Sequence, residues 1–128
     1  MLSHMFQPIS LISLLLCGCA SMSLDERPLV EYGCGDLVLI GRAETLSYTD
    51  LSGPEDALSH GLYEMDISIR KVLRGKVDSR RLRASRAAHG QLRSDLDFVF
   101  VLHLDWDEWR LDKAHLASSK PLVATNCT

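Results

Sequence analysis

Apolar and polar residues alternate, or apolar residues run continuously over short stretches, from residue 36 onward. The clearest alternation lies at 63–69, where every second residue is apolar and the residues between them are polar. The apolar positions are Tyr63, Met65, Ile67 and Ile69. A period of two is typical of a strand with one buried face, and apolar faces ten residues long at helical spacing are absent. The chain beyond residue 36 is therefore expected to be mostly β.

Two short segments are apolar on both faces, which predicts central strands. The first is 37–40, within a strand expected over 36–43, where Gly41 marks a bend or bulge. The second is 98–102. Its best candidate for a core face carries Phe98, Phe100, Leu102 and Leu104.

Turn residues and shifts of the pattern define the other elements. Residues 50–61 are expected to form a loop, with room for one helical turn at 54–58. The alternation changes face near Arg70 and Lys71, which predicts a β-bulge before a turn at Gly75. A weaker strand is expected at 81–88, and a turn at 105–108 leads to a strand at 109–116. Five strands in about 90 residues predict an all-β domain, a small OB-like barrel.

The N-terminal segment has a different character. Residues 6–17 are mostly apolar, and such a run is too short to cross a bilayer, which takes roughly 20 residues, but fits the core of a signal peptide that starts at Met1 or Met5. Alternatives are a plain secretory peptide or a buried N-terminal helix. Pro8 disfavours a helix that includes the first residues.

The end of this segment reads Leu16-Cys17-Gly18-Cys19-Ala20-Ser21, which resembles the lipobox of bacterial lipoproteins. The resemblance implies that residues 1–18 are a signal peptide and that Cys19 becomes the lipidated first residue, although no Lys or Arg precedes the apolar run. Since Ala20 and Ser21 lack the Asp that usually retains such proteins in the inner membrane, it also implies the periplasmic face of an outer membrane.

Removing that signal leaves about 110 residues, enough for one compact domain. Residues 19–31 have no periodicity and contain Pro28, so they are interpreted as a tether, and 32–128 as the barrel domain. A flexible tether of about 12 residues spans roughly 20 Å, which keeps the domain near the lipid surface. The net charge of −3 gives no overall attraction to nucleic acid.

Cys34 and Cys127 are then the two thiols left in the domain. In an oxidising compartment they are expected to pair, and closing so long a loop contributes on the order of 4 to 5 kcal/mol in the chain-entropy model. Neither cysteine has a second Cys or a His at ligand spacing, so metal and catalytic roles are disfavoured for both.

The order of these features resembles the netrin-like module, the OB-fold domain of metalloprotease inhibitors of the tissue-inhibitor type. The resemblance rests on Cys34 before the first strand, on Lys71-Val72-Leu73-Arg74-Gly75, on the apolar strand at 97–102 and on the terminal Cys127. Those inhibitors bind the protease metal through a free N-terminal Cys. Acylation of Cys19 would block that mechanism here.

The charges are unevenly distributed along the chain. A basic block between 70 and 93 contains one acid, Asp78, and an acidic block follows from 95 to 112. One interpretation is cross-strand ion pairs between the blocks, with Asp95 or Asp97 as partners of the arginines. The other is a basic face that binds lipid headgroups, cell-wall polymers or an acidic partner. The candidate binding residues are Arg80, Arg81, Arg83 and Arg86, with Trp106 and Trp109 as core residues or as an exposed platform for sugar or peptide.

Motifs for catalysis are scarce. His60, His89, His103 and His115 lie in four segments without metal-ligand spacing, and no nucleophile elbow or phosphate-binding glycine loop is present. No metal or cofactor is therefore expected, and we expect a binding module rather than an enzyme. The alternative is a weak enzyme or hydrolase accessory that uses His103 and Asp105, which share one face of a strand.

Changing the lipobox cysteine tests the export prediction. Because Cys19 is the residue expected to carry lipid, Cys19→Ala should abolish incorporation of labelled palmitate, whereas Cys17→Ala should leave it intact. Label that persists in Cys19→Ala and disappears in Cys17→Ala would contradict the assignment.

Overall fold

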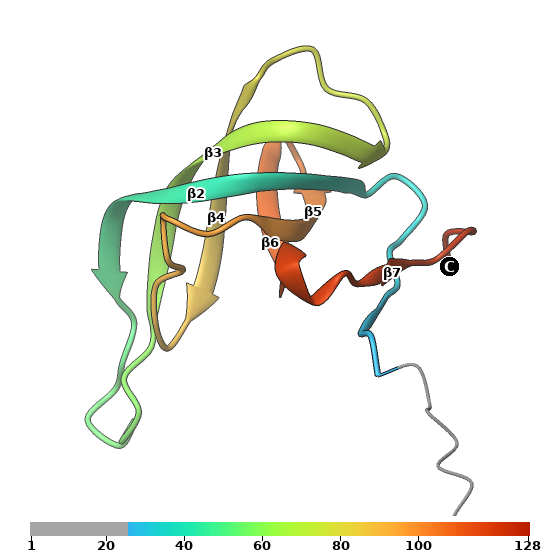
Figure 1. Ribbon diagram of the computed structural model, residues 1–128. Coiled ribbons are helices and arrows are strands. Elements are labelled where there is room, and N and C mark those ends of the chain that lie inside the picture. The colour runs from blue at the N-terminus through green and yellow to red at the C-terminus, as the bar shows by residue number, and fades with distance from the viewer. Residues whose placement is uncertain (1–25) are drawn as a thin grey trace, which may run out of the picture.

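The computed structural model describes residues 26–128, and the proposed lipobox lies outside that range. Seven strands and one short 3-10 helix follow in order (Figure 1). They are β1 Leu29–Val30, β2 Leu37–Asp50, β3 Gly61–Arg74, β4 Arg81–Ala88, β5 Phe98–Asp105, β6 Glu108–Leu116, η1 Ala117–Ser119 and β7 Leu122–Val123. None of the helical structure within 26–128 has the length and apolar character needed to span a bilayer.

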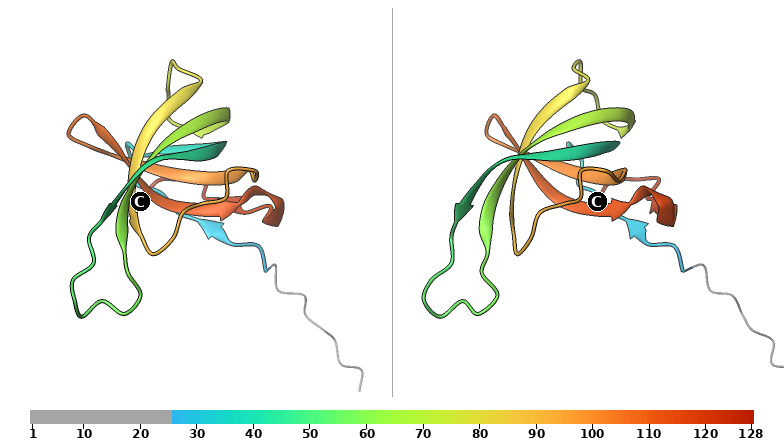
Figure 2. Two further views of the ribbon diagram at one scale, coloured as in Figure 1. Left: turned by 90° about the vertical axis from the view of Figure 1, so that its left-hand side faces the viewer. Right: turned by 60° about the vertical axis from the view of Figure 1, so that its left-hand side comes forward.

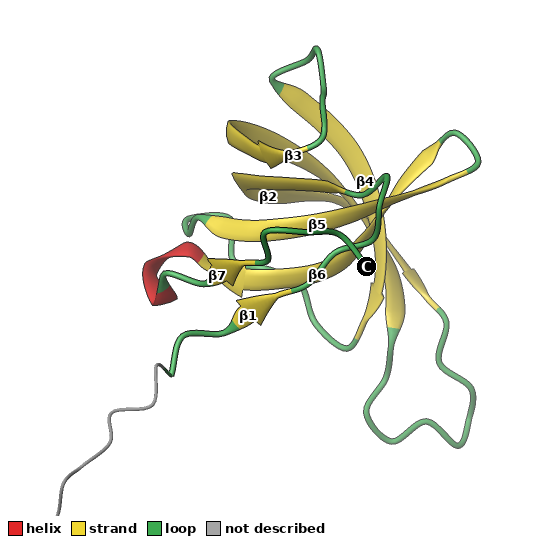
Figure 3. Cartoon of the chain, turned by 90° about the vertical axis from the view of Figure 1, so that its right-hand side faces the viewer, coloured by secondary structure: helices red, strands yellow, loops and turns green. Residues whose placement is uncertain are grey.

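Five strands close into a ring in the order β2-β3-β4-β6-β5. All neighbours are antiparallel except β4 and β6, which are parallel. The chain thus passes from β4 across to β5 before returning with β6 beside β4, and Figure 3 shows the strands curving around one another. This confirms the predicted all-β, five-stranded OB-like architecture.

The pairing of β2 with β3 is interrupted by three shifts of register. Ile40 pairs with Lys71 and Gly41 with Ile69, so Arg70 is the extra residue of a bulge at the position predicted from the change of face. A Cβ on Gly41 would lie 2.4 Å from the Ser68 carbonyl oxygen, which explains why glycine is needed where the strands bend. Gly75 ends β3 with a φ of 83°, as expected for a turn.

The main core fills the ring and draws on all five of its strands. Its fully buried side chains include Leu39, Ile67, Phe100 and Leu102. Every residue from Phe98 to Leu102 is buried, which confirms that this segment is covered on both faces. Leu104 was predicted to continue the core face and is instead 45% exposed. Pairing of β5 with β2 stops at Leu102, so Leu104 has a neighbour strand on one side only.

A second apolar cluster covers the opposite face of β2 and β5. Val38, Val99 and Val101 contact Val30 from β1, which is fully buried, and Val123 from β7. Strands β1 and β7 pair with each other in parallel, Leu29 with Leu122 and Val30 with Val123. The last residues of the predicted tether of 19–31 therefore belong to the folded domain, because Leu29 and Val30 form β1 and Val30 is part of this cluster.

Two other boundaries differ from expectation. Strand β2 continues to Asp50 rather than ending at residue 43, because its second half pairs with β3 as one arm of a hairpin. The side chains of this second half are mostly exposed. That half lacks the apolar alternation on which the boundary was based. The loop at 51–60 contains turns but no helical turn at 54–58.

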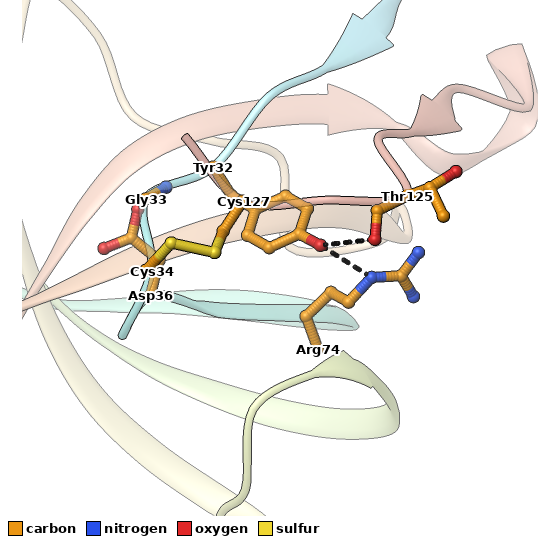
Figure 4. The surroundings of a disulfide bond; sticks show 7 residues. All are labelled: Tyr32, Gly33, Cys34, Asp36, Arg74, Thr125 and Cys127. Atoms are coloured by element: carbon orange, nitrogen blue, oxygen red, sulfur yellow. Dashed lines mark hydrogen bonds between the residues drawn. A yellow bond between two sulfur atoms is a disulfide. The ribbon is translucent and has the colours of Figure 1, made fainter.

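The Cys34–Cys127 disulfide, with Cα atoms 4.9 Å apart, joins the start of the domain to its end (Figure 4). Tyr32 reinforces this connection, because its hydroxyl accepts a hydrogen bond from Arg74 Nε at 2.9 Å and donates to the Thr125 carbonyl at 3.4 Å. A second guanidinium nitrogen of Arg74 donates to the Ala124 carbonyl at 3.1 Å. The predicted disulfide is thus confirmed, and the hydrogen bonds of Tyr32 and Arg74 with the C-terminal segment lie close to it.

Removing the disulfide should lower the free energy of unfolding by roughly 2 to 5 kcal/mol, because the unfolded chain regains the freedom of a long loop. Urea denaturation of Cys34→Ser measures the loss, and the parent protein under reducing conditions should match it. An unchanged denaturation midpoint in both samples would contradict this prediction.

Candidate functional site

The ring closes weakly between β4 and β6. These strands have eight and nine residues, yet only Ala84 with Trp109 and Ser85 with Arg110 are paired across them. We call the surface around this short pairing the seam. Two pockets flank the seam, and Ser85 lines both of them. The two pockets therefore lie where β4 and β6 are not paired, next to the two residue pairs that join them.

The first pocket has a volume of about 420 Å³ and lies toward the β5–β6 turn. Its lining combines one half-buried indole with groups of both charges. The lining residues are Glu64, Leu82, Arg83, Ala84, Ser85, Asp107, Glu108 and Trp109. An aromatic surface surrounded by a few polar groups is typical of a small-ligand site.

Trp106 stands next to this pocket at the tip of the β5–β6 hairpin. Asp105 pairs with Glu108, so the turn consists of Trp106 and Asp107. Trp106 has a φ of 61° and is 94% exposed. Figure 2 shows this hairpin, in orange, projecting from the ring. A bulky residue at positive φ is uncommon, because such turns favour glycine or asparagine at this position. The turn thus holds a large indole in solvent at the cost of backbone strain.

The second pocket, of about 570 Å³, lies on the other side of Ser85 and carries cations and carboxylates. Its charged residues are Asp36, Arg86, His103, Arg110 and Asp112. His103 Nδ1 lies 2.8 Å from Asp36 Oδ1, and the other Asp36 oxygen accepts the Gly33 N–H at 2.6 Å. The hydrogen bond with Asp36 raises the pKa of His103.

The pairing of His103 with Asp105 on which the catalytic alternative was based does not form. Asp105 instead forms an ion pair with Arg110 Nε at 2.7 Å, and Asp36 is the carboxylate that contacts the imidazole. Within 26–128, no Ser, Thr or Tyr hydroxyl is hydrogen-bonded to His103. Asp36 was missed because it is 67 positions away in the sequence and reaches β5 only through the pairing of β2 with β5.

The basic block is divided rather than gathered on one face. Arg81 and Arg83 both point outward, as the period of two predicted. Arg81 pairs with Asp66 through two nitrogens, whereas Asp95 forms an ion pair with Arg93 and Asp97 forms ion pairs with Arg42 and Arg70. The predicted pairing of Arg81 with Asp95 or Asp97 is therefore wrong. Ion pairs between the two blocks do form, but they use Arg70 and Arg93. Both acids lie before β5, which is not a neighbour of β4 in the ring.

The other candidate arginines keep their charge unneutralised by direct contact. Across the described part of the chain, Arg80, Arg83 and Arg86 form no ion pair within 4.0 Å. Arg83 lines the first pocket and Arg86 the second, but Arg80 lines neither. Of the six residues proposed from the sequence, Arg83, Arg86 and Trp109 thus meet at the seam and Trp106 adjoins it.

A third feature was not expected from the sequence. Asp56 and His60 of the β2–β3 loop lie against His89, the residue that follows β4, with potential ligand atoms within 4.8 Å of one another. The only sequence signal was the spacing of four between Asp56 and His60, since His89 is 29 positions further on.

No known protein family matches the chain, and no curated protein or solved structure matches it either.

Replacing the carboxylate beside His103 tests the geometry of the second pocket. Asp36→Asn should lower the pKa of His103 toward the ordinary histidine value of about 6.5, because the charged acceptor is lost. In the parent, the stabilisation from this pair is complete below the ordinary pKa and is lost as pH rises through the higher folded pKa. NMR titration of the imidazole signals measures the shift.

A His103 pKa that does not fall in the variant would show that Asp36 is not its partner.

Proposed function

We propose that this protein is a lipid-anchored component of a bacterial cell envelope whose OB-like domain is a non-catalytic binding module. The anchor is Cys19, and the support for it is the lipobox-like sequence from Leu16 to Ser21 after an apolar run. The proposed location is the periplasmic face of the outer membrane. The proposal includes the resemblance of the domain fold to the netrin-like module. In this proposal the binding element is the seam and not a free N-terminal cysteine.

The main support for the proposal is that an exposed indole, that of Trp106, stands next to an open pocket. Trp106 is held in solvent by a strained turn, and Trp109 lines the adjoining pocket together with Arg83. Tryptophan is enriched at interfaces, because its ring combines a large apolar surface with a polar N–H group. The hairpin therefore has the features of a recognition element.

The first pocket carries groups of both charges, which favours some classes of ligand over others. Glu64, Asp107 and Glu108 place three carboxylates around one guanidinium, Arg83. A uniformly anionic surface, such as an array of lipid phosphates, would be repelled by these carboxylates. A ligand that presents hydroxyls, amines and carboxylates together would be complemented by them.

Cell-wall polymer is the ligand that combines these groups. The apolar face of a sugar ring can stack on an indole, and its hydroxyls and amines can donate hydrogen bonds to the carboxylates. A peptide carboxylate can pair with Arg83 in a bidentate geometry. We therefore assign the seam to a glycan that carries short peptides, within reach of an anchor that holds the domain near the membrane.

Co-sedimentation with purified cell-wall sacculi tests this function, with the full-length protein kept soluble in detergent. Trp106→Ala and Arg83→Glu should each weaken binding about tenfold or more, as loss of an aromatic or arginine anchor does. Leu58→Ala, which removes another exposed apolar side chain, and Lys76→Glu, which reverses an exposed charge outside both pockets, are the matched controls and should bind like the parent.

Circular dichroism establishes that each variant is folded before binding is compared. Sacculus binding equal to that of the parent in both Trp106→Ala and Arg83→Glu would remove the seam from the proposal. Binding to anionic vesicles without binding to sacculi would show that the ligand is a lipid headgroup.

A further inference from the structure

The fold places two histidines opposite each other at the end of a hairpin. Gly61 pairs with Ala88 as the last pair between β3 and β4, so His60, one residue before Gly61, and His89, one residue after Ala88, lie at the next position. Asp56 reaches the same position from within the β2–β3 loop. Antiparallel pairing thus brings together three potential metal ligands that are scattered in the sequence.

The spacing of the two imidazoles suits a shared metal ion. Their ring centroids are 5.8 Å apart and their planes are inclined at 75°. Two histidines on one Zn²⁺, with Zn–N bonds of about 2.0 to 2.1 Å and a near-tetrahedral angle, have centroids roughly 5 to 6 Å apart. Little movement would be needed for both rings to reach one ion.

Each histidine also has a contact of the kind that orients a ligand. His89 Nδ1 lies 3.1 Å from the Ser59 carbonyl oxygen, which can only accept a hydrogen bond, so this nitrogen is the donor and Nε2 keeps its lone pair. A hydrogen bond from the second ring nitrogen to a carbonyl is the usual support of a metal-binding histidine.

Asp56 supplies the acidic member of the group. One of its oxygens contacts His60 Nδ1, and the other accepts the Leu58 N–H at 3.1 Å. An ionised carboxylate can bind the metal directly or hold His60 with its other nitrogen toward the metal.

We propose that Asp56, His60 and His89 form a binding site for a divalent transition-metal ion, with Zn²⁺ as the preferred occupant. Two imidazoles and one carboxylate suit Zn²⁺ and disfavour Ca²⁺ and Mg²⁺, which require more oxygen ligands. With Asp56 bound directly, the three protein ligands leave the fourth position open to water or to a group from another molecule. The site is separate from the seam, because none of its residues lines either seam pocket.

Metal binding would fasten the β2–β3 loop to the end of β4. Backbone contacts of this loop include the hydrogen bond from Leu51 N to the His60 carbonyl and that from Asp56 N to the Gly53 carbonyl, both within the β2–β3 connection. His89 belongs to a different strand connection and contacts this loop through its hydrogen bond with the Ser59 carbonyl. A metal ion shared by His60 and His89 would add a second link between the two connections.

Isothermal titration of Zn²⁺ into the full-length protein tests the site. The protein is purified in detergent with a tag that contains no histidine and is stripped with a chelator. One Zn²⁺ should bind per chain, and Mg²⁺ should give no heat. His60→Ala and His89→Ala should each weaken Zn²⁺ binding at least about tenfold, and His115→Ala, which removes a histidine outside the cluster, should bind like the parent.

Two readouts separate ligand loss from unfolding. Zn²⁺ should raise the melting temperature of the parent and of His115→Ala but not that of His89→Ala, and circular dichroism without metal should be the same for all three. Co²⁺ added to the parent should give the visible absorption of a four-coordinate site. Absence of one-to-one Zn²⁺ binding in the parent, or parent-like affinity in a folded His60→Ala, His89→Ala double variant, would overturn the proposal.

Discussion

Closure of the ring is the constraint on which the other features depend. Strand β5 pairs along one edge with β2 and along the other with β6, so it must bridge two parts of the chain that are far apart in sequence. The last gap, between β4 and β6, is then closed by two residue pairs only. With so few pairs between β4 and β6, the ring still has a buried core that includes Phe100 and Leu102. Two pockets lie at its surface, and Ser85 lines both.

Burial of β5 on both faces requires a cover outside the ring, and the two ends of the domain provide it. Val30 and Val123 close over Val99 and Val101, and the backbone hydrogen bonds from Leu122 to Pro28 and from Ala124 to Val30 hold the covering strands together. Two-residue strands would be marginal on their own. The Cys34–Cys127 disulfide and the Arg74–Tyr32 hydrogen bond make this cover a fixed part of the domain.

Features that depend on local pattern were predictable, and those that depend on strand order were not. Alternation at 63–69 and the change of face at Arg70 located β3 and its bulge, because the period of two is a property of adjacent residues. The partner of Arg81 was mispredicted, since proximity of the two charge blocks in sequence does not make β4 and β5 neighbours. Asp36 beside His103 and His89 beside His60 are contacts across paired strands, which no single segment encodes.

Strand β4 links the two candidate surfaces while keeping them distinct. All eight of its residues pair with β3, so its residues occupy fixed positions relative to that strand. Ser85 belongs to the seam and His89 follows four residues later, a separation of about 13 Å at the usual rise of a strand. A charge or metal at His89 would therefore act weakly on Arg83 through solvent. The seam and the Asp56–His60–His89 cluster can therefore have separate proposed roles, one in binding a polymer and one in fixing a loop. Strand β4 holds them at a constant distance, at which binding at one has little electrostatic effect on the other.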